Sequence, residues 1–380
     1  MIDLLSRAIS ILRVRAENCA GVLRARTRER GSKKNSTLAA RCRVVEEQVN
    51  SILAEIDRKV ITLEKTRRSV DEHRITAEQA EVVLRGVLRS YRGMRRDIDA
   101  IEENFVGHIS RFSNEDERLT ALAGRLWSET GLPGHPPVAV TNTIGYFCTL
   151  APFGIIFSPP SIDRDLLIFP DLYHEFGHIL HSAPGGGLFG PRFQKELDQY
   201  LTELRNKARR TSRPIEPRLM SQIRERWIES WAEEVACDTL ATCIVGPAFG
   251  WCNLNLCLKN SNAFESGHQH PADAARTRHM IRVLRRRGHA DAADEMEGLW
   301  DRFLHFSGQT PKPYFNDLHP DGLFIAIMED VESAIAKLGI GGGVSPFVAT
   351  LNQAWAEFHK SVDGYYQWEK GVFSDLRSLL

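Results

Sequence analysis

The sequence predicts a mainly helical (α+β) fold in two parts: a long-helix arm over residues 1–130, and a mostly helical domain with a small β-hairpin over residues 131–380. Three observations support this division. All 17 prolines lie from Pro133 onward, and Tyr91 is the only aromatic residue among the first 100. Residues 1–130 carry 25 Lys and Arg against 20 Asp and Glu, whereas the rest of the chain carries 24 against 29. A proline-free, highly charged segment is typical of long helices with solvated faces.

Apolar residues recur in the first part at steps of four and three, which places them along one seam of a helix. The runs are Leu5, Ile9, Leu12, Ala16, Cys19 and Leu23; then Leu38, Cys42, Val45, Val49, Ile52, Ile56 and Leu63; then Leu84, Val87, Tyr91, Met94, Ile98, Ile101 and Phe105. So narrow a seam must be buried against another helix. We therefore expect a coiled coil, formed either by a hairpin within the chain or by a second copy in a homodimer.

The seam is weak between residues 63 and 84, and two arrangements are open there. One helix can run from about Ser36 to about Gly107, or the chain can break near residues 71–76. In the second case Thr76 and Gln79 match a capping box, which starts a new helix.

The overall composition argues against several classes of partner. Lys and Arg number 49, as do Asp and Glu, so the net charge is zero; nucleic acid and membrane surfaces are therefore not expected partners. Asp3 and Arg7 interrupt the apolar amino terminus, so we expect no signal peptide. Seven cysteines without a CxxC pair fit a reducing compartment, and no segment offers the ~20 continuous apolar residues of a membrane span. We expect a cytoplasmic protein.

The second part begins with two short apolar runs, Tyr146–Leu150 and Gly154–Ser158, which predict a β-hairpin with an edge strand. The pattern that follows is helical. We expect helices over residues 170–182, 193–210, 217–245, 271–287, 290–306, 322–338 and 346–362.

The first of these helices contains the motif HExxH. His174 and His178 are four residues apart, so both imidazoles leave one helix face and can chelate a tetrahedral Zn²⁺. Glu175 can act as the general base toward a zinc-bound water. The alternative is an exposed helix whose histidines bind nothing.

A third ligand is predicted from the helix over residues 217–245. Glu234 can complete a His₂Glu site with the fourth position open to water, as in catalytic zinc sites. Asp238, one turn later, can accept the free N–H of a ligating histidine, in particular His174. The surrounding residues are apolar, and carboxylates in such a helix need a partner. Glu233 is offset by about 100° and is expected on the surface.

Two further residues follow in the segment His-Gln-His270-Pro-x4-Arg276. His270 and Arg276 are candidates to donate to the oxyanion of a tetrahedral intermediate. The alternative is an ordinary helix start with surface charges. Tyr146 is a candidate for hydrogen bonding to substrate in the cleft, and a packed core tyrosine is its alternative.

HExxH, then ExxxD about 55 residues later, then HPx4R, resembles the gluzincin family that includes the CAAX prenyl endopeptidases and heat-shock membrane proteases. The resemblance covers roughly residues 140–285. It implies a zincin-like fold and a zinc endopeptidase with His174, His178 and Glu234 as ligands, Glu175 as base and Asp238 behind the ligands. It also implies that His270 and Arg276 stabilise the transition state. Those relatives carry transmembrane helices and lack a heptad arm, so a soluble protein substrate is favoured here.

The leading hypothesis is thus a soluble zinc-dependent endopeptidase that cleaves a protein or peptide substrate, with the coiled-coil arm serving regulation, oligomerisation or substrate selection. One alternative is a non-catalytic scaffold with a structural metal, in which His268 or His181 supplies a fourth ligand. A second alternative is an autoinhibited protease effector of stress or phage defence.

Overall fold

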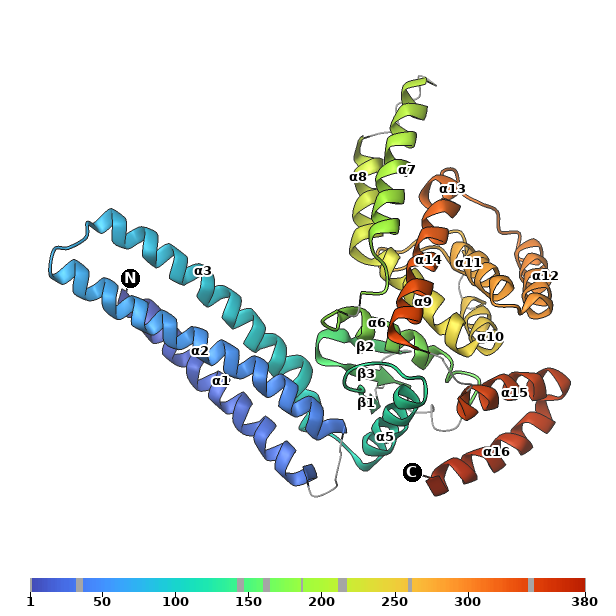
Figure 1. The fold of residues 1–380 in the computed structure, drawn as a ribbon, viewed down its shortest axis with the longest axis horizontal. Helices are drawn as coiled ribbons and strands as arrows, with labels where there is room; N and C mark the ends of the chain where they lie inside the picture. Colours follow the sequence, from blue (N-terminus) through green and yellow to red (C-terminus); the bar gives the residue numbers. More distant parts are fainter. Residues whose placement is uncertain are drawn as a thin grey trace. The chain divides into compact units, whose positions relative to one another are not determined.

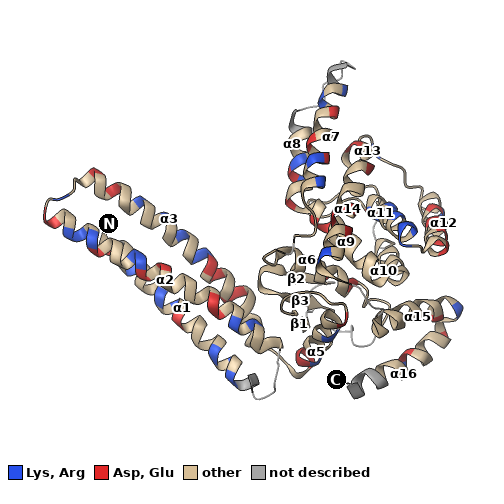
Figure 2. Cartoon of the chain, in the orientation of Figure 1, with Lys and Arg blue, Asp and Glu red and all other residues tan. Residues whose placement is uncertain are grey.

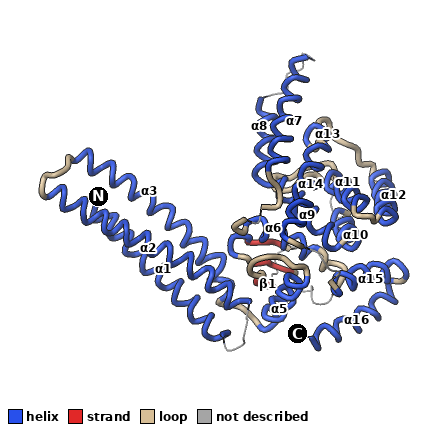
Figure 3. Tube along the Cα trace, viewed as in Figure 1, coloured by secondary structure: helices blue, strands red, loops and turns tan. Residues whose placement is uncertain are grey.

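The computed structural model describes residues 2–31, 37–141, 147–159, 165–185, 187–210, 217–258, 262–340 and 345–379. The predicted mainly helical fold is confirmed: helices dominate, and three short strands form one small sheet (Figures 1 and 3). The chain divides into two compact units. The first comprises Met1–Ala121, Pro137–Val140 and Phe153–Ile155; the second comprises Leu122–Pro136, Thr141–Pro152 and Ile156–Leu380.

Three long helices pack together in the first unit: α1 (Ile2–Gly31), α2 (Thr37–Asp71) and α3 (Ala77–Ile101). We call them the three-helix bundle. The chain continues from α3 through a π-helical turn (Glu102–Val106) into α4 (Gly107–Ile109). Most of the predicted seam residues are buried, from Leu5 to Leu23 on α1 and from Leu38 to Leu63 on α2, because α1 lies along α2 and α3 within the same chain. Lys, Arg, Asp and Glu residues are spread along all three helices (Figure 2).

The chain breaks between α2 and α3, which selects the second of the two arrangements left open by the sequence. Residues 72–76 form a turn, in which His73 has a φ of 54°. Thr76 caps α3: its hydroxyl accepts the Gln79 N–H, and the Gln79 side chain accepts the Thr76 N–H. The predicted capping box is confirmed.

The sheet consists of β1 (Val138–Thr141), β2 (Cys148–Leu150) and β3 (Ile155–Ser158), in the order β1-β3-β2. None of these strands contains a charged residue. The two predicted strands correspond to β2 and β3, and β1 is an additional strand. Within the described chain β2 has a strand neighbour on one side only, which makes it an edge strand.

Helices make up most of the second unit, and the predicted helical segments are present. The helix expected over 217–245 is continuous but contains a π-helical turn at Trp227–Trp231, between α8 and α9. The elements are α5 (Asn114–Glu129), which spans the unit boundary, α6 (Asp171–Ser182), α7 (Pro191–Arg210), α8 (Pro217–Arg226), α9 (Ala232–Val245), α10 (Pro247–Cys257), α11 (Asp273–Arg286), α12 (Ala290–Phe306), α13 (Phe315–Leu318), α14 (Asp321–Leu338), α15 (Pro346–Lys360) and α16 (Val362–Leu379). Helices α5, α10, α13 and α16 are additional to those that the sequence predicts.

Helix α6 packs closely against α9 because Gly177 has no side chain. A Cβ atom at this position would lie 2.8 Å from Cys237 Sγ and 3.0 Å from Cys237 Cα on α9. Phe176 of α6 also packs on Trp127 of α5 and on Tyr173 of the same helix, with ring centroids 5.3 and 5.5 Å away. All of these aromatic side chains are buried. The close approach at Gly177 brings the polar side chains of α6 and α9 within reach of each other.

No helix among the described residues is both long enough and apolar enough to cross a bilayer.

Candidate metal centre

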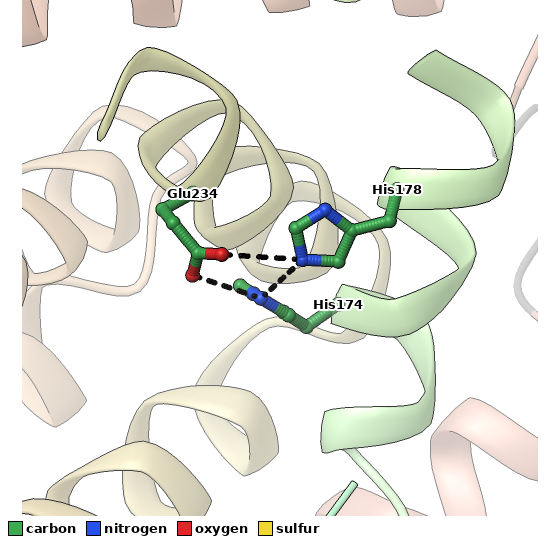
Figure 4. Close-up of side chains that lie close together, drawn as sticks. All are labelled: His174, His178 and Glu234. Atoms are coloured by element: carbon green, nitrogen blue, oxygen red, sulfur yellow. Dashed lines mark hydrogen bonds and ion pairs between the residues drawn. The ribbon is translucent and has the colours of Figure 1, made fainter. Parts of the chain in front are cut away.

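The two histidines of HExxH lie one turn apart on α6 and direct their imidazoles toward the same point (Figure 4). His174 Nε2 and His178 Nε2 are 3.2 Å apart. Both side chains are largely buried, at 10% and 16% exposed.

Glu234 reaches the same point from α9. One carboxylate oxygen lies 3.4 Å from His174 Nε2, and the other lies 3.4 Å from His178 Nε2 (Figure 4). Ligand atoms bound at about 2.1 Å around a tetrahedral zinc stand about 3.4 Å apart. The three predicted ligands therefore have the mutual spacing that a tetrahedral cation requires. In the part of the chain that the structure describes, no fourth His, Cys, Asp or Glu joins this group.

Each histidine is oriented by a carboxylate on α9. His174 Nδ1 lies 2.9 Å from Asp238 Oδ1, the pairing that the sequence predicts. His178 Nδ1 lies 2.8 Å from Glu233 Oε1. If each Nδ1–H donates to its carboxylate, both Nε2 atoms are left without a proton, and their lone pairs face each other across 3.2 Å. A cation between them removes this repulsion.

The expectation that Glu233 is a surface residue is wrong. A glutamate side chain is long enough to reach sideways from its helix position, and Glu233 reaches His178 in this way while remaining 30% exposed. A chemical argument could have identified the role of Glu233. Two metal-ligating histidines each need an acceptor for the second ring N–H, and Glu233 is the carboxylate nearest in sequence to Glu234.

The electrostatics of the cluster favour a positive charge at its centre. Burial opposes ionisation of Glu234, but hydrogen bonds with His174 and His270 and the charge of Arg276 hold its pKa well below the usual range. Burial also opposes protonation of His174, yet Asp238 and Glu234 raise its pKa. Both effects describe a site in which buried carboxylates attract a cation.

Arg276 forms an ion pair with Asp238, the carboxylate that also contacts His174. Its Nε and Nη2 atoms lie 2.7 and 2.8 Å from the two oxygens of Asp238, which is fully buried. Burial would raise the pKa of Asp238, but Arg276 and His174 hold it far below its usual range. The same Nη2 lies 3.8 Å from Glu234. The Nε–Nη2 edge of the Arg276 guanidinium is therefore occupied by the Asp238 carboxylate.

The remaining predicted residues surround a cavity of about 520 Å³. Glu175, Glu234, His270 and Phe249 line it together with His174. Glu175 is buried and accepts a short hydrogen bond from Thr149 Oγ1 on β2. His270 is about half exposed, and its Nδ1 lies 2.9 Å from Glu234. Thr149 was not singled out in the sequence, because its contact with Glu175 joins residues 26 apart. Tyr146 lies outside the described residues; its neighbour Phe147 lines the cavity.

His181 and His268, the histidines considered as a fourth ligand, do not join the group of His174, His178 and Glu234. His181 Nδ1 lies 3.2 Å from the Leu188 N–H, which donates to it, and its ring stacks on Phe189 at 4.7 Å. The backbone carbonyl of His268 accepts the hydroxyl of Ser230. Cys237, Cys252 and Cys257 are buried.

No protein-family model, no curated protein and no solved structure matches this chain.

Proposed function

We propose that this protein is a zinc-dependent endopeptidase of the gluzincin type, with His174, His178 and Glu234 as zinc ligands. The observation that carries the proposal is the spacing of 3.2–3.4 Å among the three ligand atoms, beside a cavity that Glu175 also lines. A structural zinc normally has four protein ligands, whereas a catalytic zinc has three and an open position. Three ligands beside an open cavity favour catalysis.

Zinc at such a site lowers the pKa of a bound water to about 7 and polarises a carbonyl. Glu175 is assigned as the general base that receives the proton from the attacking water. Its Oε2 accepts the Thr149 hydroxyl, so its other oxygen is assigned to the proton transfer. Asp238 and Glu233 hold the two ligand histidines with Nε2 facing inward.

His270 and Arg276 receive different roles. His270 is partly exposed at the cavity and is assigned to the oxyanion of the transition state. The Nε–Nη2 edge of Arg276 is bound to Asp238. We therefore assign Arg276 to the positioning of Asp238, and through it His174, in place of the direct contact with the oxyanion that the resemblance implies.

The substrate is proposed to be a protein or peptide in extended conformation. The edge strand β2 packs against α6, which carries both histidines. Extended peptides bind open strand edges through main-chain hydrogen bonds. A peptide paired with β2 would thereby be guided along α6 toward the cavity.

The coiled coil over residues 1–130 is proposed to select the substrate or to regulate cleavage. The three-helix bundle buries its apolar seam internally, so its charged outer faces are left for recognition.

The test combines metal analysis with hydrolysis of a fluorescence-quenched peptide library. The full-length chain should hold about one zinc and cleave peptides internally. Glu175→Gln should keep the zinc and lose ~10²–10⁴-fold in rate, the usual contribution of a general base. Glu203→Gln, an exposed glutamate on α7, is the matched control and should cleave like the wild type. A fully active Glu175→Gln variant would contradict the proposal.

A further inference from the structure

The hydrogen bond between Thr149 and Glu175 joins the proposed base to a strand whose following turn is held by the three-helix bundle. Thr149 is the middle residue of β2, and it donates to Glu175 Oε2. The chain then passes through a single 3₁₀ turn, Ala151–Phe153, to Gly154 and β3. Only four residues separate Thr149 from Gly154.

The guanidinium of Arg41 on α2 lies directly against Gly154, and both residues belong to the first unit. A Cβ atom on Gly154 would lie 2.3 Å from Arg41 Cζ, so the guanidinium fills the space that any other side chain would need. Gly154 also has a φ of +61°, a conformation that favours glycine. Its carbonyl accepts the Val138 N–H of β1 at 2.9 Å.

A second contact within the first unit holds the preceding residue. The Phe153 ring packs on Phe105 in the π-helical turn after α3, with centroids 6.2 Å apart, and Phe105 is fully buried. Arg41 is itself buried, and burial lowers its pKa to about 10.

We propose that Thr149 is a positioning residue for Glu175, and that Arg41 of the three-helix bundle sets the position of Thr149 through the turn at Gly154. This inference rests on the proposed function, since Glu175 is its base. Thr149 contacts none of the three proposed zinc ligands through any hydrogen bond found in the described chain. Loss of its hydroxyl therefore acts on the rate of the chemical step and leaves metal and substrate affinity unchanged.

The first test compares four variants in the zinc-loaded, full-length chain. Thr149→Val should lower kcat by about tenfold, the value of a hydrogen bond to a charged group, with KM and zinc affinity unchanged. Thr149→Ser keeps the hydroxyl and should restore kcat. Arg41→Met should lower kcat in the same way, whereas Arg43→Met, an exposed arginine on the same helix, should not. Wild-type kcat in Thr149→Val or in Arg41→Met would overturn the inference.

The second test asks whether Arg41 and Thr149 affect kcat through the same chain of contacts to Glu175. The double variant Arg41→Met with Thr149→Val should be no slower than the slower single variant, because coupled residues are not additive. If the kcat of the double variant falls by the product of the two single losses, the inference is overturned. Gly154→Ala drives a methyl group into the Arg41 guanidinium from the opposite side, so it should reproduce the kcat loss if Arg41→Met folds poorly.

A third readout does not need peptide cleavage. Amide hydrogen exchange of peptides covering residues 147–158 should accelerate in Arg41→Met and not in Arg43→Met. Unchanged exchange in Arg41→Met would overturn the link between the bundle and the turn. If the wild type cleaves no peptide, the proposed function fails, and the exchange result still decides this link.

Discussion

Glu233 Oε1 lies 2.8 Å from His178 Nδ1, and this contact mirrors the one between Asp238 and His174 at 2.9 Å. One helix, α9, thus supplies the proposed metal ligand Glu234 and a carboxylate for each of the two histidines. The pair of glutamates at 233 and 234 divides these two tasks between adjacent residues.

Glu233→Gln should weaken zinc binding by about 10- to 100-fold, the usual cost of removing the acceptor behind a ligand histidine. Titration of the apoprotein against a zinc chelator measures this change. Glu229→Gln, an exposed glutamate one turn earlier on the same continuous helix, is the control and should bind zinc like the wild type. Equal affinity in the two variants would show that Glu233 does not support the site.

Gly177→Ala should destabilise the protein by about 1–3 kcal/mol, the usual cost of overpacking a close contact. The new methyl group would approach Cys237 Cα at 3.0 Å and push α6 away from α9. Because the proposed zinc ligands are divided between these helices, zinc affinity should fall as well. Urea unfolding of the metal-free protein gives the first quantity. At Gly190 a Cβ meets nothing within 4 Å, so Gly190→Ala should unfold near the wild-type midpoint; a shared midpoint for both variants would contradict the packing argument.

Arg276→Met should cost about 3–5 kcal/mol, because it leaves Asp238 as a buried charge without its partner. Arg285→Met removes an arginine that pairs with Asp294 and Glu297 on the surface, and it should cost no more than about 1 kcal/mol. Denaturant unfolding of both variants tests the contrast. Adding Asp238→Asn to Arg276→Met should recover part of the stability while weakening zinc binding. A mild effect of Arg276→Met alone would refute the role assigned to this ion pair.

His319 should make the fold less stable in mild acid. Its Nδ1 lies 2.9 Å from the Phe315 carbonyl, and its Nε2 lies 3.0 Å from the Ser266 hydroxyl, so the buried ring is neutral. Burial, with Arg278 and Arg226 nearby, lowers its pKa to about 4. The unfolded chain takes up a proton near pH 6.5 and the folded chain does not, so this group's contribution to stability is complete above that pH and is lost as the pH falls toward 4.

Between pH 6.5 and pH 5 this loss amounts to about 1.5 kcal/mol. His319→Gln removes the titrating group, so the stability advantage of the wild type over the variant should shrink by about that amount on acidification. Urea unfolding of both proteins at the two pH values measures it. An advantage that stays constant, or grows, would contradict the assigned pKa direction.

The helices and the grouping of His174, His178 and Glu234 could be predicted because their signals are local. Heptad spacing marks a buried seam on each of α1, α2 and α3, and Thr76 with Gln79 marks the start of α3. His174 and His178 share a face of any helix, and Glu234 with Asp238 shares a face of another. These relations depend only on helical geometry.

The contacts that sequence reasoning missed depend on how separate elements meet. Helix α10 is apolar around most of its circumference and therefore shows no amphipathic period. The hydrogen bond from Thr149 to Glu175 joins a strand to a helix, and the contact of Arg41 with Gly154 joins α2 to a turn more than a hundred residues later. The prediction that Glu233 lies on the surface was wrong because its angle around the helix does not account for the length of its side chain.

The most direct test of the central claim is X-ray absorption at the zinc edge of the full-length protein. The account predicts a four-coordinate site with nitrogen and oxygen ligands near 2.0–2.1 Å, two imidazoles among them, and one oxygen that does not come from the protein. His178→Ala should remove one imidazole contribution. A third imidazole, a sulfur ligand, or a fourth protein ligand would show a closed structural site and contradict the proposal of catalysis.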